Sequence, residues 1–359
     1  MATTKEIVNN VYTYGLRGME RKIRMGVPRT RFLQEHYFGG QGLMTAQRFI
    51  KLKIKKRARH AAAQAEWNSK GNIIKDDNGF YYKIVEAPYF YDRHVITPDE
   101  LDQLDFEEDV ANPLPYDQKI LLVLQNDRED LYDKQETSRE LLAFEVLSTG
   151  KFALIDGSVQ DFGLNSSMFV NAAADAAGKL SAASNKAKWL TDKCKAILED
   201  SGVLVDEILL DPDAIWTLLG DTTVQELLDT RRVEGGLIDL QKYKDDGVAY
   251  HGTLKLPGFG DVKLLSYAGR YTKDDDSEAY IFPAGSLLFG RANLGDTNHA
   301  AVYSNDGQGK LSRKVAAKEF VHVVEGDGDI PSNMAVCLQS SPLYSPKIQG
   351  GWMYVYNAL

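Results

Sequence analysis

Six histidines are the first candidates for acid–base or metal chemistry in this sequence of 359 residues. They are His36, His60, His94, His251, His299 and His322. None belongs to an HExxH motif or has a paired spacing, and the sequence has no P-loop, no GxGxxG after a strand and no GxSxG elbow. An isolated histidine is most often solvated or hydrogen-bonded. The sequence therefore predicts no catalytic residue and no enzyme, although an unrecognised cytosolic enzyme remains an alternative.

The spacing of the acidic residues and the cysteines predicts no metal site either. Asp274–Asp276 lacks the glycine and the distal glutamate of an EF-hand, so it predicts a solvated hairpin turn. Cys194 and Cys337 lie 143 positions apart and form no CxxC pair, which disfavours a disulfide framework and a thiolate metal site and fits a reducing compartment. The sequence predicts no metal and no cofactor.

Basic residues are concentrated at the N-terminal end. The first sixty residues carry 14 Lys or Arg against 3 Asp or Glu, whereas the whole chain has a net charge of −9, so about −20 falls on the rest. The densest part comprises Arg48, Lys51, Lys53, Lys55, Lys56, Arg57 and Arg59. Such an end must find acidic surface or bind an anion.

The residues between these lysines help to choose a partner. A site for single-stranded nucleic acid needs interleaved aromatic side chains for stacking. Here Leu52 and Ile54 alternate with the lysines, and the aromatic residues come as the separate run Phe80–Tyr82, without a neighbouring arginine. This pattern favours a cationic strand face that meets the acidic body of a neighbouring molecule. Nucleic-acid binding, and a hairpin folded back on its own acidic body, remain alternatives.

A long hairpin is predicted to carry this face. The period of two in 45–56 predicts one strand with an apolar and a cationic face, and 80–85, after the turn signal Asn78-Gly79, predicts a second. The whole of 45–96 is interpreted as the hairpin, with an extended tip. A lone two-stranded ribbon is barely stable in water, so it must pack on its own domain or on another subunit.

Helices and short strands account for the remaining chain. Residues 1–40 show no sustained hydrophobic period, so we expect an extended arm with at most a short helix around Arg31–His36. The segment Ile96–Leu101 has the capping box that marks the start of a helix. Tyr116–Leu147 predicts a helix of about 45 Å, and Ala172–Gly202 a second. Short strands from Val203 onward show no regular βαβ alternation, so the fold class is α+β.

No membrane segment is predicted. Met1–Tyr14 is polar, without the apolar stretch of a signal peptide, and the densest apolar run, Ile120–Leu124, is too short to cross a bilayer. We expect a soluble protein that is intracellular when made.

Several segments, in their order along the chain, carry a family resemblance. Thr30–Phe38 has Phe-Leu followed by an aromatic end, and Thr45–Ile54 has the pattern of a strand that leads into a loop. Gly79–Leu101 places a proline–aromatic step before a basic stretch and a helix start, Leu228–Arg232 contains Asp-Thr-Arg-Arg, and Leu338–Leu343 contains Gln-Ser-Ser-Pro-Leu. In these segments the chain resembles the lambda-type major capsid proteins of tailed phages, the phage major capsid protein E family. It departs from them after the first loop strand, where Lys55–Ala58 replaces the family's proline–glycine step.

The resemblance implies a fold and a division of the chain. The implied fold is α+β of the Hong-Kong-97 type, with an N-terminal arm, an extended E-loop, a peripheral domain with a long spine helix, and an axial domain. The implied bounds are 1–44 for the arm, 45–100 for the E-loop hairpin, 101–184 for the peripheral domain with its spine helix at about 116–148, 185–320 for the axial domain and 321–359 for closing C-terminal strands.

The resemblance also implies a function. The chain would self-assemble, as hexamers and pentamers, into the icosahedral head shell of a tailed phage that encloses double-stranded DNA without sequence-specific binding. Portal, scaffolding and decoration proteins would be partners, the location the virion after synthesis in the cytoplasm of a host bacterium, and a membrane is not involved. A cellular nanocompartment shell with the same fold is the alternative. The residues expected to contact the neighbouring subunit are Arg48, Lys51, Lys53, Lys55, Lys56, Arg57, Arg59, Trp67, Tyr81 and Tyr82.

Overall fold

The computed structural model describes residues 31–55, 80–96, 116–175, 178–229, 247–273, 275–305, 311–314, 319–325 and 334–359. The predicted helix start at Ile96–Leu101 and the predicted hairpin tip lie mostly outside these residues. Both helices and sheets are present, without regular βαβ alternation, as the sequence predicts.

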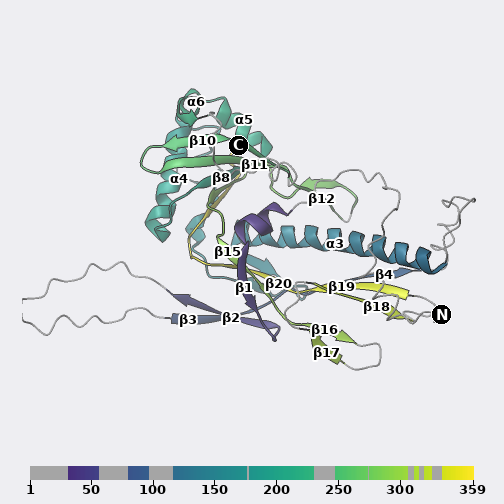
Figure 1. Cartoon of the computed structure of the whole chain (residues 1–359). Coiled ribbons are helices and arrows are strands. Elements are labelled where there is room, and N and C mark those ends of the chain that lie inside the picture. Colours follow the sequence, from purple (N-terminus) through teal and green to yellow (C-terminus); the bar gives the residue numbers. More distant parts are fainter. Residues whose placement is uncertain are drawn as a thin grey trace, which may run out of the picture.

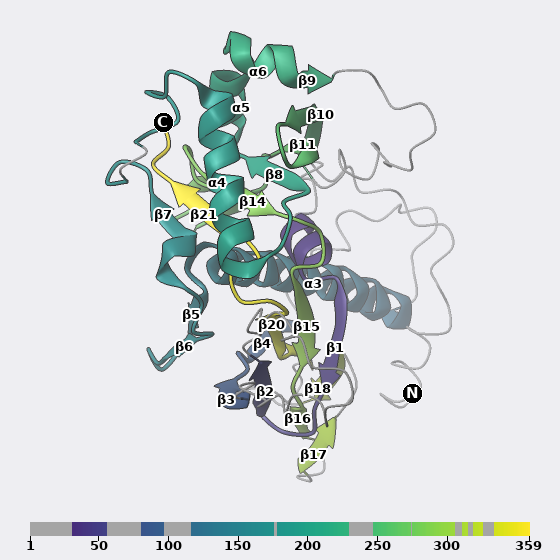
Figure 2. The ribbon, with the colours of Figure 1, turned by 90° about the vertical axis from the view of Figure 1, so that its left-hand side faces the viewer.

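A seven-stranded mixed sheet forms the upper part of the molecule in Figure 1. Its order is β7 (Phe169–Asn171), β21 (Met353–Tyr356), β14 (Leu287–Gly290), β8 (Glu207–Leu210), β11 (Gly260–Tyr267), β10 (Val248–Leu256) and β9 (Leu228–Asp229). Helices α4 (Lys186–Ser201), α5 (Pro212–Leu219) and α6 (Thr222–Leu227) lie against it, as Figure 2 shows. Leu190, Ile197, Ile208 and Leu264 are fully buried between these layers.

Local signals set the bounds of these helices. Asp211 caps α5 by accepting from the amides of Asp213 and Ala214, with Pro212 at the first helical position. Gly202 ends α4 with φ of 72°, a conformation that glycine adopts without strain. The predicted helix Ala172–Gly202 is wrong in its first half, because Asn185 caps α4 and the helix begins only at Lys186.

The long helix α3 (Tyr116–Thr149) crosses beneath this sheet in Figure 1. Its 34 residues span about 51 Å. The first half packs Val123, Leu124 and Leu131 on a three-stranded sheet of β18 (Phe320–Glu325), β19 (Met334–Ser340) and β4 (Phe90–Ile96). The second half buries Leu142 and Val146 in the largest core cluster, so one helix joins two cores.

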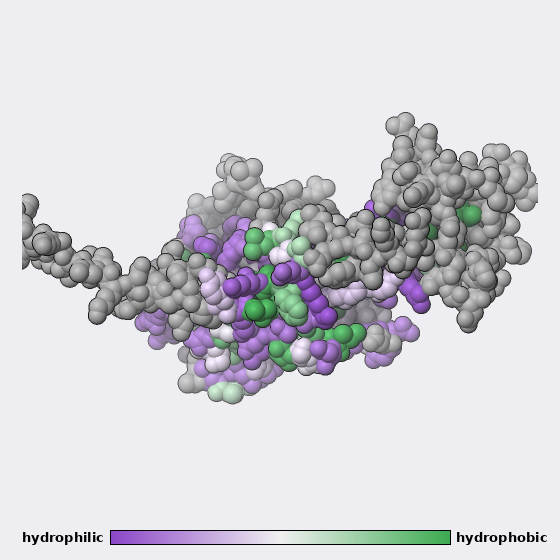
Figure 3. All heavy atoms as spheres, turned by 90° about the horizontal axis from the view of Figure 1, so that it is seen from below, coloured by the Kyte–Doolittle hydropathy of each residue, from purple (hydrophilic) through white to green (hydrophobic). Residues whose placement is uncertain are grey.

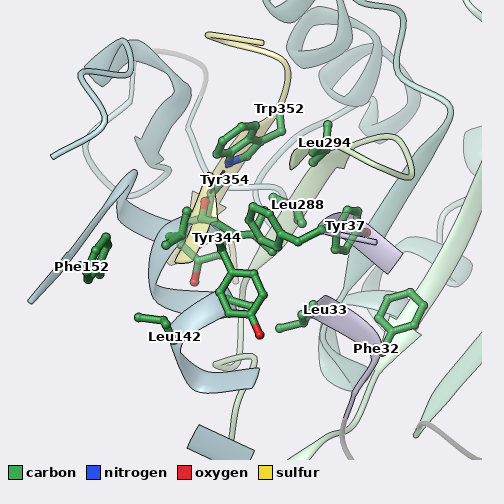
Figure 4. Packing of buried hydrophobic residues seen from close by; sticks show 14 of the residues in the cluster. Phe32, Leu33, Tyr37, Leu142, Phe152, Leu288, Leu294, Tyr344, Trp352 and Tyr354 are labelled. Carbon is green, nitrogen blue, oxygen red and sulfur yellow. Dashed lines mark hydrogen bonds between the residues drawn. The ribbon is translucent and has the colours of Figure 1, made fainter. Parts of the chain in front are cut away.

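The described end of the predicted arm contains the short helix expected around Arg31–His36, but this segment is part of that largest core instead of extending into solvent. A π-helix runs over Leu33–Tyr37, and Phe32, Leu33, Tyr37 and Phe38 are buried, as Figure 4 shows for the first three. Strand β1 (Gly40–Met44) then pairs in parallel with β15 (Gly295–His299), which pairs with β20 (Pro342–Pro346). Apolar side chains at four of seven positions, 32, 33, 37 and 38, explain why this segment is not left in water.

The predicted hairpin is shorter than the sequence suggests. Strands β2 (Phe49–Lys55) and β3 (Phe80–Glu86) pair antiparallel, but β4, inside the predicted hairpin region, pairs with β19 instead. Three further hairpins join β5 (Lys151–Ala153) to β6 (Val159–Asp161), β12 (Arg270–Thr272) to β13 (Glu278–Tyr280), and β16 (Val302–Asn305) to β17 (Leu311–Lys314). Between β12 and β13 the described residues of the acidic run, Asp275 and Asp276, lie in the connecting turn, as predicted, with the Ser277 amide donating to Asp275.

Burial of the arm end leads to a prediction about stability. Replacing Leu33, which is fully buried, by alanine should lower the free energy of unfolding by about 2–5 kcal/mol, because the cavity lies in the largest core. Leu43→Ala is the matched control, since that side chain is 63% exposed and should change the same free energy by about 0.5 kcal/mol or less. Urea unfolding of unassembled subunits measures both, and equal effects would contradict the burial of the arm.

Candidate assembly interface

The hairpin β2–β3 has one covered face and one open face. The register pairs Phe49 with Glu86 and Lys55 with Phe80. On the covered face, Ile50 and Val85 are fully buried in the largest core. On the open face, Phe49 is 51%, Tyr82 55% and Ile84 65% exposed. We call Phe49, Lys51, Tyr82 and Ile84 the hairpin outer face.

The hairpin outer face is not simply cationic, which corrects the expectation from its sequence. The Nζ atom of Lys51 lies 4.1 Å from the centre of the Tyr82 ring, so its charge meets an aromatic face of its own hairpin. Arg48, at the start of β2, forms an ion pair with Glu86 of β3. The base of the hairpin therefore presents partly compensated charge together with three exposed apolar side chains.

The other predicted contact residues are placed in part. Lys53 and Lys55 take alternate positions of β2, and Tyr81 pairs with Ile54 across the hairpin. Lys56, Arg57, Arg59 and Trp67 lie outside the described residues. The sequence-based prediction missed Phe49 and Ile84. Their exposure could have been predicted, because each is next in its strand to a buried residue, Ile50 or Val85, and successive side chains of a strand point to opposite faces.

More exposed apolar residues lie beside the hairpin. The Glu86 amide donates to Gln160 Oε1 (3.3 Å), which joins β3 to β6. At the tip of the β5–β6 hairpin Ile155 is fully exposed, and Val159 is also exposed. Figure 3, which views the molecule from below, shows hydrophobic residues among hydrophilic ones at the surface. Contiguous exposed apolar surface is typical of contact with another macromolecule.

A buried polar cluster in the middle of α3 holds the arm end. Glu140 is fully buried and accepts from the amides of Leu33 (2.7 Å) and Gln34 (3.0 Å) and from the Tyr267 hydroxyl (2.8 Å) of β11. Glu136, one turn earlier, accepts from the Gln34 side-chain amide (2.7 Å). Because these carboxylates bond both the segment before β1 and strand β11, they fix the arm and the upper sheet on the same helix.

The same cluster holds the sheet β18–β19–β4 on α3. Arg139 donates to Glu136 (2.7 Å) and to Glu319 (2.6 Å), directly before β18. Gln135 donates to Asp92 of β4 (3.0 Å) and to the Leu338 carbonyl of β19 (2.9 Å). Buried polar groups are costly unless paired, so these partners restrict how the helix and sheet can pack.

A row of aromatic rings lies on the opposite face of that sheet, away from α3. Tyr89 stacks on Tyr91, Tyr91 on His322 and His322 on Phe320, with ring centroids 5.5–6.4 Å apart. Tyr89 and Tyr91 are about half exposed, and Tyr91 donates to the sulfur of buried Cys337 (3.5 Å). This hydrogen bond, together with burial, raises the pKa of Tyr91 to about 12, so the row carries a neutral phenol at physiological pH.

Comparison with known families decides what this arrangement belongs to. The model of a family described as phage major capsid protein E matches residues 16–355. The chain belongs to the phage major capsid protein E family. The sequence matches none of the curated proteins. As a major capsid protein, it is a subunit of a phage head shell rather than of a nanocompartment.

Solved structures give the same fold. A protein assigned as the capsid protein of an E. coli CFT073 prophage superposes with a TM-score of 0.66 at 14% identity, covering 99% of both chains. The capsid of Ralstonia phage GP4 gives 0.55 at 12% identity, covering 95% of this chain and 94% of that one. The head of Helicobacter pylori bacteriophage KHP40 gives 0.52 at 12% identity, covering 97% and 96%. The fold of this major capsid protein is therefore the Hong-Kong-97-type capsid fold.

The described part of this capsid protein places three of its histidines beside polar partners. No three His, Cys, Asp or Glu side chains within it converge as a metal ion would need. His36 is hydrogen-bonded to Glu207 (2.7 Å) and His251 to Ser266 (2.7 Å), as predicted, and His94 lies 3.1 Å from Asp127. No described helix is both long and apolar enough to span a bilayer.

An open groove of about 640 Å³ lies at the C-terminal end of α3. Phe144, Phe169, Tyr354 and the ion pair Lys151–Asp161 (3.1 Å) are among its lining residues, and no histidine or cysteine is.

The two cysteines give a prediction about reactivity. Both are buried and free, and burial raises the pKa of Cys194 to about 12, which leaves roughly 10⁻⁴ of it as thiolate at pH 8. We expect neither thiol to react with an aromatic disulfide reagent in the native subunit and both to react after denaturation. Rapid reaction of one equivalent in the native subunit would contradict this burial.

Proposed function

We propose that this major capsid protein builds a closed shell of hexamers and pentamers by laying its hairpin across the adjacent subunit, with the hairpin outer face as contact. The observation that carries the proposal is the unequal covering of the ribbon: Ile50 and Val85 are locked into the core, whereas Phe49, Tyr82 and Ile84 stay open. Burying an aromatic or aliphatic side chain of this size stabilises by about 1.5–3 kcal/mol each.

A shell needs heterologous contacts that close and repeat. A long ribbon suits this need, because it buries much area on a neighbour while each of its contacts remains weak. The base of the ribbon is held by its own subunit, because Ile50 and Val85 are buried in the largest core. In the alternative, the basic hairpin folds back on the acidic body of its own subunit. The contacts of two of its basic residues do not favour this, because Arg48 pairs with Glu86 and Lys51 contacts Tyr82, both within the hairpin.

The charge of the chain fits this role. The first sixty residues carry +11 and the rest about −20, so the basic end of one subunit complements the body of another. An acidic body also repels phosphate, which lets enclosed double-stranded DNA slide without sequence-specific binding.

The remaining parts of the proposal follow from this role. The subunit would be made in the cytoplasm of a host bacterium, would end in the virion, and would meet portal, scaffolding and decoration proteins. It would catalyse no reaction. The division into arm (1–44), E-loop (45–100), peripheral (101–184), axial (185–320) and C-terminal (321–359) parts is proposed with it.

Charge reversal tests the electrostatic half of the contact. The triple variant Lys51→Glu, Lys53→Glu, Lys55→Glu should abolish shell formation while the subunit stays folded, because the altered strand would repel an acidic neighbour. The control reverses three exposed lysines elsewhere, Lys188, Lys195 and Lys255, with the same change of net charge. Electron microscopy and sedimentation measure assembly, and normal shells from the hairpin variant would sink the proposal.

A second pair of variants tests the apolar half. Phe49→Ser with Ile84→Ser should raise the subunit concentration needed for assembly by at least about tenfold, since two buried side chains are lost from each contact. Leu204→Ser removes an equally exposed side chain far from the hairpin and should assemble like the parent. Unchanged assembly by the double variant would show that the apolar face is not buried in the shell.

A further inference from the structure

Three buried carboxylates hold the short segment Arg31–Phe38 on the body of the subunit. Glu140 accepts from the amides of Leu33 and Gln34, and Glu136 accepts from the Gln34 side chain and lies 3.2 Å from Arg31 Nε. Glu207 of β8 lies 2.7 Å from His36. The segment is therefore held largely by groups whose charge depends on pH.

Glu140 is the centre of this arrangement. Its Oε1 atom accepts from Leu33 N and Tyr267 Oη, and its Oε2 atom accepts from Gln34 N. Three separate elements thus meet at one carboxyl group: the arm end, helix α3 and strand β11 of the upper sheet. The Leu33 and Gln34 amides can only donate, whereas the Tyr267 hydroxyl can donate to a carboxylate or accept from a carboxylic acid.

We propose that Glu140 is a protonation-dependent latch, which holds the arm segment Arg31–Phe38 on α3 and the upper sheet when it is neutral and loosens it when it ionises. The latch joins the parts of the subunit that carry the hairpin to the parts that carry the seven-stranded sheet. It is a property of the single subunit and does not depend on shell assembly.

The surroundings of Glu140 explain why the proton matters. Complete burial raises the pKa of Glu140 to about 8; the three donated hydrogen bonds oppose this rise, and the charge of Glu136 adds to it. Arg139, one residue earlier, is committed to Glu136 and Glu319. Tyr344, whose pKa burial raises well above its usual value, donates to Gln34 Oε1 (3.0 Å) and stays neutral. Other charged or titratable groups around the segment are Arg31, which lies over the Tyr132 ring, the pair His36–Glu207, and Glu35 and Tyr37 of the segment itself.

The sign of the effect follows from the direction of the shift. The closed segment holds the proton more tightly than an open segment, in which Glu140 would titrate near its ordinary value of 4.5. Stability of the closed segment is therefore full below about pH 4.5, falls as the pH rises, and levels off above about pH 8. Between these limits the ratio of closed to open segments falls by up to about tenfold per pH unit.

Hydrogen–deuterium exchange on unassembled full-length subunits tests the latch. The Leu33 and Gln34 amides bond to Glu140 itself, so their protection, corrected for the intrinsic exchange rate, reports its hold. From about pH 5.5 to about pH 7.5 we expect at least a tenfold loss of protection, and none further from about pH 8.5 to about pH 9. In Glu140→Gln the protection of these two amides should no longer depend on pH, even if its absolute level differs from that of the parent. A change of less than about threefold in the parent, or an unchanged fall in Glu140→Gln, would overturn the proposal.

Three more variants separate Glu140 from its neighbours. His36→Gln should keep the fall; a flat profile would assign the titration to the His36–Glu207 pair and overturn the proposal. Glu145→Gln, a half-buried carboxyl on the same helix that bonds to the Ala153 amide, is the matched control and should also keep it. Tyr267→Phe removes one donor to the carboxylate, so the pH at which the fall levels off should rise by roughly one unit. If the dependence of protection on pH were the same in Tyr267→Phe as in the parent, the proposed link from Glu140 to the upper sheet would be wrong.

Discussion

The buried polar cluster in the middle of α3 is the constraint on which the rest of this subunit depends. The helix packs apolar side chains on a small sheet at one end and on the largest core at the other, and between them it buries Gln135, Glu136, Arg139 and Glu140. Such groups stabilise a fold only when every partner is in place. Here the partners come from the arm end, β4, β19, β11 and the residue before β18, so the cluster permits one arrangement of elements that are distant in the sequence.

The hairpin depends on this arrangement without taking part in it. Its base is attached through Ile50 and Val85 to the core that the arm end completes, and through Glu86 to β6. The two-stranded ribbon is thereby stabilised from one face only, and the other face is left for a partner. A fixed base with an open face gives the contact a defined direction, which matters in a shell because each subunit must meet its neighbour at a repeatable angle.

Local signals could be read from the sequence, and non-local ones could not. The alternation of Ile50, Leu52 and Ile54 and the helix end at Gly202 are decided by neighbouring residues, and both were placed correctly. The helix start at Lys186 was missed, because the alanine-rich stretch before it has helical propensity that the packing of Ala172 and Leu180 overrides. Burial of Phe32–Phe38 and convergence on Glu140 were also missed, because their partners lie more than a hundred residues away. The outer face was called cationic since its lysines are conspicuous, although Phe49 and Ile84 share it.

The mixed character of that face changes what the charge asymmetry can do. Attraction between a +11 end and a −20 body acts over roughly 8–10 Å in physiological salt, which orients an approaching subunit but holds it weakly once both charges are solvated. Apolar side chains act only on contact, and salt does not screen them. A face that combines Lys51 with Phe49, Tyr82 and Ile84 can therefore select the partner at a distance and keep it at short range. In the proposed contact neither part is strong by itself, so a misplaced subunit that satisfies only one of them would leave again, and the growing shell would correct the error.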